Sequence, residues 1–174
     1  MTESGFQAAP PDRAAAPMAR ARKVPAPLRL LAVVDGTERT NRVLDYIVTL
    51  AQGRDAIEVI VLNVQSKSHD ARLRGYQSFK QDEVDDRLIN DLGTPIVGGA
   101  SRWLDKAHIR HRSKVLIGEP VQIILRCAAE EDCDSIVIGD RRPEGMSGWI
   151  SATLGSTPVL RLLATASTPV VVVK

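Results

Sequence analysis

The feature that most constrains the fold is an alternation of short apolar runs with stretches of helical periodicity. Leu30–Val34 is a continuous apolar run, which is typical of a strand covered on both faces. Asp35-Gly36-Thr37 then predicts a turn, and Thr37 is placed to cap a helix. That helix should end at Gly53 and is predicted by apolar residues of helical spacing: Val43, Leu44, Ile47, Val48 and Ala51. A second apolar run at 57–64 completes a strand–helix–strand unit, whose strands should be parallel.

The same alternation continues to the end of the chain. A polar loop is expected at 66–76, and the charged first half of a third strand at 109–117 favours a sheet edge. Pro120 suits the first position of the next helix, whose core face is predicted to carry Val121, Ile124, Leu125 and Ala128. Fourth and fifth strands are expected at 135–138 and 170–173.

Two helical stretches in this half carry more specific predictions. The first is a long helical stretch whose core-facing side is predicted to carry Val84, Leu88 and Leu92, and then Val97, Ala100, Leu104 and Ala107. Gly93-Thr94-Pro95 interrupts it and predicts a kink or a break. The last helix is expected to bury Val159, Leu160 and Leu163.

Strands that alternate with helices predict an α/β fold with a parallel sheet and helices on both faces. We expect five strands in the order 3-2-1-4-5, which is a Rossmann-like arrangement. Ligands of such sheets bind at the carboxyl ends of the strands, where the winding direction reverses.

Residues 1–27 differ from the rest of the chain in composition. They are rich in Ala, Pro and Arg without apolar periodicity, which predicts a disordered arm ahead of one domain at 28–174. The chain has 23 basic and 21 acidic residues, and the arm holds four and two of them, so 19 of each remain in the domain. This balance, with only six aromatic residues, argues against a nucleic-acid partner.

Other classes of function lack their usual signals. No apolar run approaches the roughly 20 residues that span a membrane, so we expect no membrane partner. Cys127 and Cys133 predict ordinary buried thiols in a reducing, cytoplasmic setting, because their spacing matches no common metal signature. His69, His108 and His111 stand near no nucleophile or second metal ligand. We therefore expect no catalytic residues and no metal site, and the chain is predicted not to be an enzyme.

Polar turns follow the first and fourth predicted strands, which should be neighbours. Asp35 is suited to accept hydrogen bonds from a ribose or an adenine amine, and Gly139 would let the backbone approach a ligand. Gly155, Ser156 and Thr157 would open a helix whose free N–H groups favour a phosphate. The structural alternative stays open: Asp35 and Thr37 shape a turn, and Ser156 caps a helix.

At these residues the chain resembles the universal stress protein family. The similar segments follow one another in order over 28–174: Val33-Val34-Asp35-Gly36-Thr37, Leu62-Asn63-Val64, Gly118-Glu119-Pro120, Ile136-Val137-Ile138-Gly139, Gly155-Ser156 and Ser167-Thr168-Pro169-Val170-Val171-Val172-Val173. The resemblance implies the fold of the adenine nucleotide alpha hydrolases. It also implies ATP or another adenine nucleotide as ligand, with Mg²⁺ as a candidate companion, and a stress-response or signalling role.

The resemblance also assigns site residues. The end of the first strand at Val34, with Asp35 and the backbone of Val64, would hold the adenosine part. ATP-binding members resemble one another in a phosphate loop of Gly-x-x-Gly, nine residues, then Gly and Ser or Thr. Here its members would be Gly139, Arg142, Gly145, Gly155, Ser156 and Thr157. Arg142 replaces the second glycine, and the intervening segment is three residues longer.

The altered loop leaves several interpretations open. Arg142 either binds a phosphate through its guanidinium or is a solvated loop residue. Trp149 in the same loop is a lid over the site, a partner contact or a side chain packed on the domain surface. If the altered loop does not bind a nucleotide, the alternative to a nucleotide-binding domain is a dimeric interaction module. Weak ATP hydrolysis is a third reading that no catalytic constellation supports.

The resemblance finally implies a homodimer. The C-terminal strand formed by Val170, Val171, Val172 and Val173 is the expected seam, because an apolar edge strand invites pairing with its copy. A further protein partner, of unknown identity, is also compatible with this family.

Overall fold

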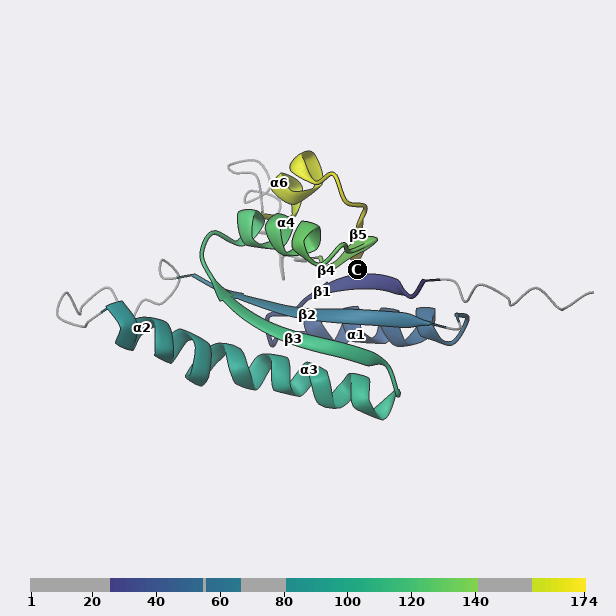
Figure 1. Ribbon diagram of the computed structural model, residues 1–174, viewed down its shortest axis with the longest axis horizontal. Coiled ribbons are helices and arrows are strands. Elements are labelled where there is room, and N and C mark those ends of the chain that lie inside the picture. The colour runs from purple at the N-terminus through teal and green to yellow at the C-terminus, as the bar shows by residue number, and fades with distance from the viewer. Residues whose placement is uncertain (1–25, 55, 67–80, 141–157) are drawn as a thin grey trace, which may run out of the picture.

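The computed structural model describes residues 26–54, 56–66, 81–140 and 158–174. These residues form one parallel sheet in the order β3-β2-β1-β4-β5 (Figure 1). The strands are β1 (Leu28–Val33), β2 (Ile57–Gln65), β3 (Arg110–Ile117), β4 (Ser135–Gly139) and β5 (Val170–Val173). The predicted fold class and strand order are confirmed, as is the position of β3 at an edge.

Helices cover both faces of the sheet, as predicted (Figure 1). Those described are α1 (Glu38–Ala51), α2 (Gln81–Arg87), the π-helical segment η2 (Leu88–Gly93), α3 (Thr94–Lys106), α4 (Pro120–Glu130) and α6 (Pro158–Thr165). α1 and α3 pack on one face, and α4 and α6 pack on the other. No helix among the described residues is long and apolar enough to cross a membrane.

The core consists of two apolar clusters separated by the sheet. Leu30 and Val61 point toward α1 and α3, whereas Leu31 and Leu62, their neighbours in sequence, point toward α4. Because successive side chains of a strand alternate between faces, both halves of the alternation must be apolar when helices cover both faces. Each such side chain contributes about 1.5–3 kcal/mol by its burial. This is why the central strands are continuous apolar runs.

The long helical stretch is irregular where Gly93-Thr94-Pro95 predicts a kink or a break, but the chain stays helical there. The main-chain N–H of Thr94 bonds to the carbonyl of Ile89, five residues back, as in a π-helix. Core positions consequently fall at Leu88, Gly93 and Val97, with spacings of five and then four. The prediction that Leu92 faces the core is wrong, because the wider turn rotates it outward, where it is 40% exposed.

The face that α6 turns inward also differs from the prediction. Leu162 is fully buried, whereas Leu160 and Leu163 are 50% and 46% exposed, and Val159 is half-buried. Apolar residues occupy nearly every side of this short helix, so its periodicity does not choose a face. Packing against α4 decides for Leu162.

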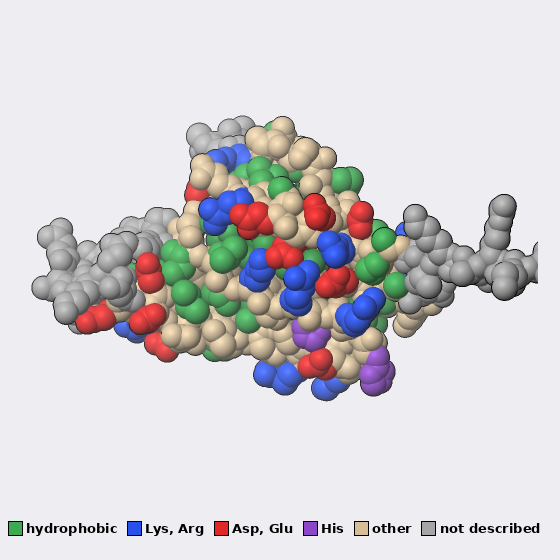
Figure 2. Space-filling view, in the orientation of Figure 1, with side chains coloured by type: hydrophobic (Ala, Val, Ile, Leu, Met, Phe, Trp, Pro, Cys, Tyr) green, Lys and Arg blue, Asp and Glu red, His purple; other side chains and the backbone are tan. Residues whose placement is uncertain are grey.

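A part of the sheet that no described helix covers carries alternating charges instead (Figure 2). Arg29 and Arg112 both pair with Glu58, at 3.2 and 3.3 Å, and Arg112 also reaches Glu131 at 3.0 Å. Lys114 hydrogen-bonds to Glu131, which lowers the pKa of the carboxyl and raises that of the ammonium group. Ion pairs across three strands therefore make this surface polar, and positive and negative charges alternate on it.

Candidate functional site

The turn between β1 and α1 is built by two threonines. Thr37 is the N-cap of α1, as predicted, and its hydroxyl accepts a hydrogen bond from the N–H of Arg39. The hydroxyl of Thr40 accepts the N–H groups of Asp35 and Gly36, both at 3.0 Å. Gly36 has φ +77°, a conformation that strongly favours glycine. This turn therefore has one well-defined conformation at the end of β1.

The carboxylate of Asp35 is surrounded by donors. Its Oδ1 accepts the N–H of Thr37 at 3.0 Å, the hydroxyl of Thr37 at 2.6 Å and that of Thr40 at 3.2 Å. Among the described residues, its Oδ2 accepts only from Arg39, through Nε at 3.0 Å and through Nη2. Burial would raise the pKa of Asp35, but the hydrogen bonds from Thr37 and Arg39 together hold it below its usual value. Asp35 thus shapes the turn through Oδ1, whereas Oδ2 pairs with the side chain of Arg39.

A buried asparagine fixes the end of β1 to β2. Asn63 is 2% exposed, and its Nδ2 donates to the carbonyl of Val34 at 2.8 Å. Its Oδ1 in turn accepts from Gln65 at 2.6 Å. Asn63 appears in the sequence only as part of a family-like segment, and its structural role was missed. The available signal was an amide side chain directly after the apolar run Val59–Leu62.

The main chain of Val64 faces the space beyond the end of β1. The last paired residues of β1 and β2 are Val33 and Leu62, and the Leu62 carbonyl accepts the N–H of Val34 at 2.9 Å. The carbonyl of Gln65 instead accepts from Gly118, on the β3 side. Since main-chain groups alternate between the two sides of a strand, those of Val64 point to the β1 side, past the point where β1 ends.

Gly139 ends β4 and lies against the first turn of α1. A Cβ at this position would stand 2.7 Å from the Cβ of Arg39 and 3.1 Å from its carbonyl oxygen. One turn later, Arg42 reaches the carbonyl of Asp140 at 3.4 Å. Gly139 is therefore required for the close packing of α1 on β4, which is a reason for glycine that the sequence alone did not reveal.

The structure thus brings part of the predicted site together. Val34, Asp35, Val64 and Gly139 all lie at the carboxyl ends of the adjacent strands β2, β1 and β4. The remaining predicted site residues, which are Arg142, Gly145, Gly155, Ser156 and Thr157, lie outside the described residues, as does Trp149. The phosphate half of the site therefore stays a prediction from the sequence.

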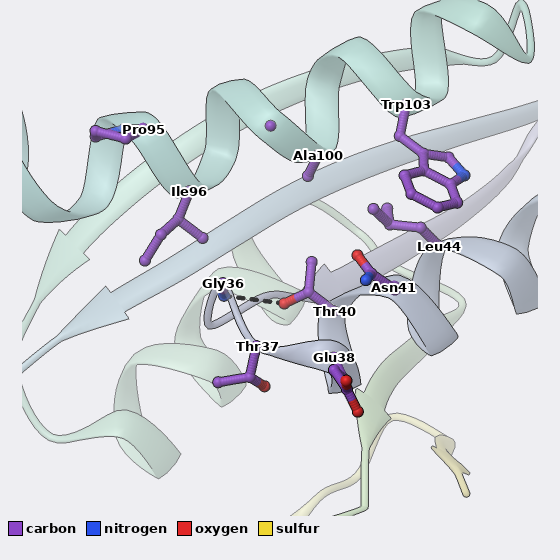
Figure 3. Close-up of a pocket in the computed structure, with 11 residues that line it drawn as sticks. Gly36, Thr37, Glu38, Thr40, Asn41, Leu44, Pro95, Ile96, Ala100 and Trp103 are labelled. Carbon is purple, nitrogen blue, oxygen red and sulfur yellow. Dashed lines mark hydrogen bonds between the residues drawn. The ribbon is translucent and has the colours of Figure 1, made fainter.

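A separate pocket of about 550 Å³ opens on the other side of the same turn (Figure 3). It lies between α1 and α3 and is lined by Gly36, Thr37, Glu38, Thr40, Asn41, Leu44, Pro95, Ile96, Gly99, Ala100 and Trp103. Asp35, Val64 and Gly139 do not line it. The pocket is therefore distinct from the predicted nucleotide site at the ends of β1, β2 and β4, although both border the β1–α1 turn.

The cysteines and the possible metal ligands were predicted to form no site. Cys127 and Cys133 are buried and unpaired, as predicted. Burial raises the pKa of both thiols, that of Cys133 to about 11, so neither is a thiolate near neutral pH. No three His, Cys, Asp or Glu side chains within the described ranges are grouped closely enough to hold a metal ion.

The winding direction of the parallel sheet reverses between β1 and β4, and a polar turn lies at this reversal. This arrangement defines a Rossmann-like, doubly wound α/β protein. The model of the universal stress protein family matches residues 28–174. The chain belongs to the universal stress protein family. No curated protein sequence matches it significantly.

Solved structures with the same fold agree with this assignment. The hypothetical protein MJ0577 superposes with a TM-score of 0.66 at 20% identity, over 84% of this chain and 95% of its own. A universal stress protein in complex with cAMP gives 0.57 at 16% identity, over 84% and 96%. The universal stress protein from Archaeoglobus fulgidus in complex with dAMP gives 0.53 at 22% identity, over 85% and 98%. At these identities the likeness establishes the fold.

Proposed function

We propose that this protein binds an adenine nucleotide, with ATP as the first candidate, in a stress-response or signalling role in the cytoplasm. The observation that carries the proposal is the early end of β1. Because β1 stops at Val33 while β2 continues to Gln65, main-chain groups of Val64 face a space that the Asp35 turn borders. Two proteins of this fold are known in complex with cAMP and dAMP, which supports an adenine nucleotide as the ligand class.

The parts of the nucleotide would be held by different residues. Val64 offers one main-chain donor and one acceptor, which suit the edge of an adenine ring. Asp35 would accept from a ribose hydroxyl, and Val34 lies directly before it. The phosphates would extend toward Gly139 and the segment with Arg142, Gly145, Gly155, Ser156 and Thr157. Mg²⁺, where present, would be bound mainly by phosphate oxygens, because the described residues hold no cluster of ligands for it.

The chemistry of the turn favours binding over turnover. A general base needs a carboxylate that can take up a proton near neutral pH. The hydrogen bonds that Asp35 accepts stabilise its ionised form and lower its pKa, so it is a poor base. We therefore propose that the protein holds the nucleotide without hydrolysing it.

We also propose a homodimer formed through β5. This strand lies at a sheet edge and consists of Val170, Val171, Val172 and Val173, all half-buried and none charged. The preceding helix adds the exposed side chains of Leu160 and Leu163. An apolar edge strand beside an apolar helix surface is a favourable seam for a second copy.

Thermal unfolding with ATP and Mg²⁺ tests the proposed ligand. At a ligand concentration 100-fold above Kd, binding stabilises the folded state by about 2.7 kcal/mol. We expect the Tm of the wild type to rise by several degrees. Asp35→Asn should abolish most of the rise, because the amide offers Arg39 and the ribose a weaker acceptor.

The matched control is Asp45→Asn, which makes the same change on the exposed side of α1. It should keep the rise of the wild type. A wild-type Tm that does not move at millimolar ATP with Mg²⁺ would contradict the proposal.

A further inference from the structure

Arg39 stands between the two halves of the proposed site. Its guanidinium holds Oδ2 of Asp35 at the end of β1, and its Cβ and main chain lie against Gly139 at the end of β4. A ligand that lies across the crevice from β1 to β4 must therefore meet this side chain.

The two oxygens of Asp35 differ in how easily they can be freed. Oδ1 accepts from Thr37 and Thr40, and the same hydroxyls cap α1 and bind the N–H groups of the turn. Freeing Oδ1 would thus disturb the start of α1. Within the described ranges Oδ2 is held by the Arg39 side chain alone, and this ion pair is partly exposed to solvent, which makes it weak.

The place to which Arg39 would turn is already favourable for an anion. Arg42, one turn further along α1, reaches the carbonyl of Asp140, and its buried Nε has no hydrogen-bond partner among the described residues. Two cationic side chains of α1 thus border the end of β4, where the predicted phosphate segment begins.

We propose that Arg39 is a specificity-determining residue that competes with the ligand for Asp35 and so selects phosphorylated adenine nucleotides over the free nucleoside. The proposal rests on the proposed function. A nucleoside that takes Oδ2 breaks the ion pair and offers Arg39 nothing in return. A nucleotide breaks the same pair but provides a phosphate, with which a guanidinium forms strong charge-assisted hydrogen bonds.

Calorimetric titration with adenosine, AMP and ATP tests this role. Arg39→Met keeps most of the stem that packs on Gly139 but removes the charge. We expect it to bind adenosine more tightly by about two- to fivefold, because the weak ion pair no longer competes. AMP and ATP should bind more weakly by about five- to tenfold, because a charge-assisted hydrogen bond is lost. Arg39→Lys should recover part of the wild-type preference because it restores the charge.

The control is Arg54→Met, which removes the same charge beyond the far end of α1, about 20 Å away along the helix. It should leave the ratio of ATP to adenosine affinity unchanged. If Arg39→Met changes both affinities in the same direction, or neither, Arg39 has only a structural role and the inference is wrong. If the wild type binds none of the three ligands, the proposed function itself fails, and this inference fails with it.

Discussion

At the scale of single residues, a few side chains near the end of β1 decide its geometry. Asn63 is the most constrained of them, because it is buried and hydrogen-bonds both the Val34 carbonyl and Gln65. A carbonyl that leaves the strand ladder must find another donor or lose hydration without compensation. Asn63 supplies that donor and thereby holds the residue before Asp35 in place.

Replacing Asn63 by leucine should therefore destabilise the protein. Leucine keeps the branching of asparagine although it is larger, and the Val34 carbonyl loses its side-chain donor, so we expect a loss of about 1–3 kcal/mol in the free energy of unfolding. Urea denaturation measures it. Asn41→Leu, at an exposed position of α1, should change the same free energy by no more than about 0.5 kcal/mol. Equal losses in the two variants would show that the Asn63 hydrogen bonds are not what stabilises the turn.

Residue types indicated the site at this scale only in part. Asp35 and Thr37 follow an apolar run, so a polar turn at a strand end could be predicted from the sequence. The competition between Arg39 and a ligand for Asp35 could not be predicted. An arginine four residues after an aspartate usually forms a surface ion pair, and only the position of β4 shows that Arg39 lies beside Gly139. The same holds for Asn63, whose partner is 29 residues away.

At the scale of elements, the contact between α1 and β4 brings Arg39 beside the end of β4. The first turn of α1 approaches Gly139 so closely that no side chain fits there. The sequence predicted both elements, and it predicted glycine as a point of close approach. The prediction was that a ligand approaches Gly139, whereas in the structure α1 does so. Contacts between distant segments leave no periodic signal in the sequence.

Gly139→Ala should destabilise the protein and shift α1. A Cβ 2.7 Å from that of Arg39 forces the helix to move, at a cost of about 1–3 kcal/mol in the free energy of unfolding. Denaturant unfolding checks the value. The matched change is Gly53→Ala, where a Cβ meets nothing within 4 Å, and there we expect a change of no more than about 1 kcal/mol in either direction. A Gly139→Ala protein as stable as the Gly53→Ala protein would contradict the close packing of α1 on β4.

Helix faces were the least predictable property of the elements. The spacing of three or four residues predicts Leu92, Leu160 and Leu163 in the core, but all three are exposed. A π-helical turn changes that spacing between Leu88 and Gly93, and α6 is apolar on most sides. In both cases tertiary packing selects the buried residue, and the local pattern does not.

At the scale of the whole molecule, the strand order follows from few rules. Apolar runs separated by amphipathic helices require parallel strands, and the charged start of β3 places it at an edge. This is why the fold could be predicted well from the sequence. The other edge is β5, whose uncharged valines give the surface through which we propose that two copies pair.

Val172→Pro tests that pairing. The carbonyls of Pro169 and Val173 accept from β4, so the alternate residues 170 and 172 direct their main-chain groups away from the sheet. Proline at 172 would then spare the bonds to β4 but remove an N–H that a second copy needs. We expect a monomer by light scattering at micromolar concentration, whereas Val172→Thr should remain a dimer. A monomeric wild type would contradict the proposed dimer.

The central claim is that an adenine nucleotide binds at the ends of β1, β2 and β4. Amide NMR spectra recorded during titration with ATP and Mg²⁺ test both the binding and its place. We predict saturable shifts at Asp35, Val64 and Gly139, while the indole N–H of Trp103 in the α1–α3 pocket stays unchanged. Spectra that do not change at millimolar ATP, or changes centred on Trp103, would contradict the account.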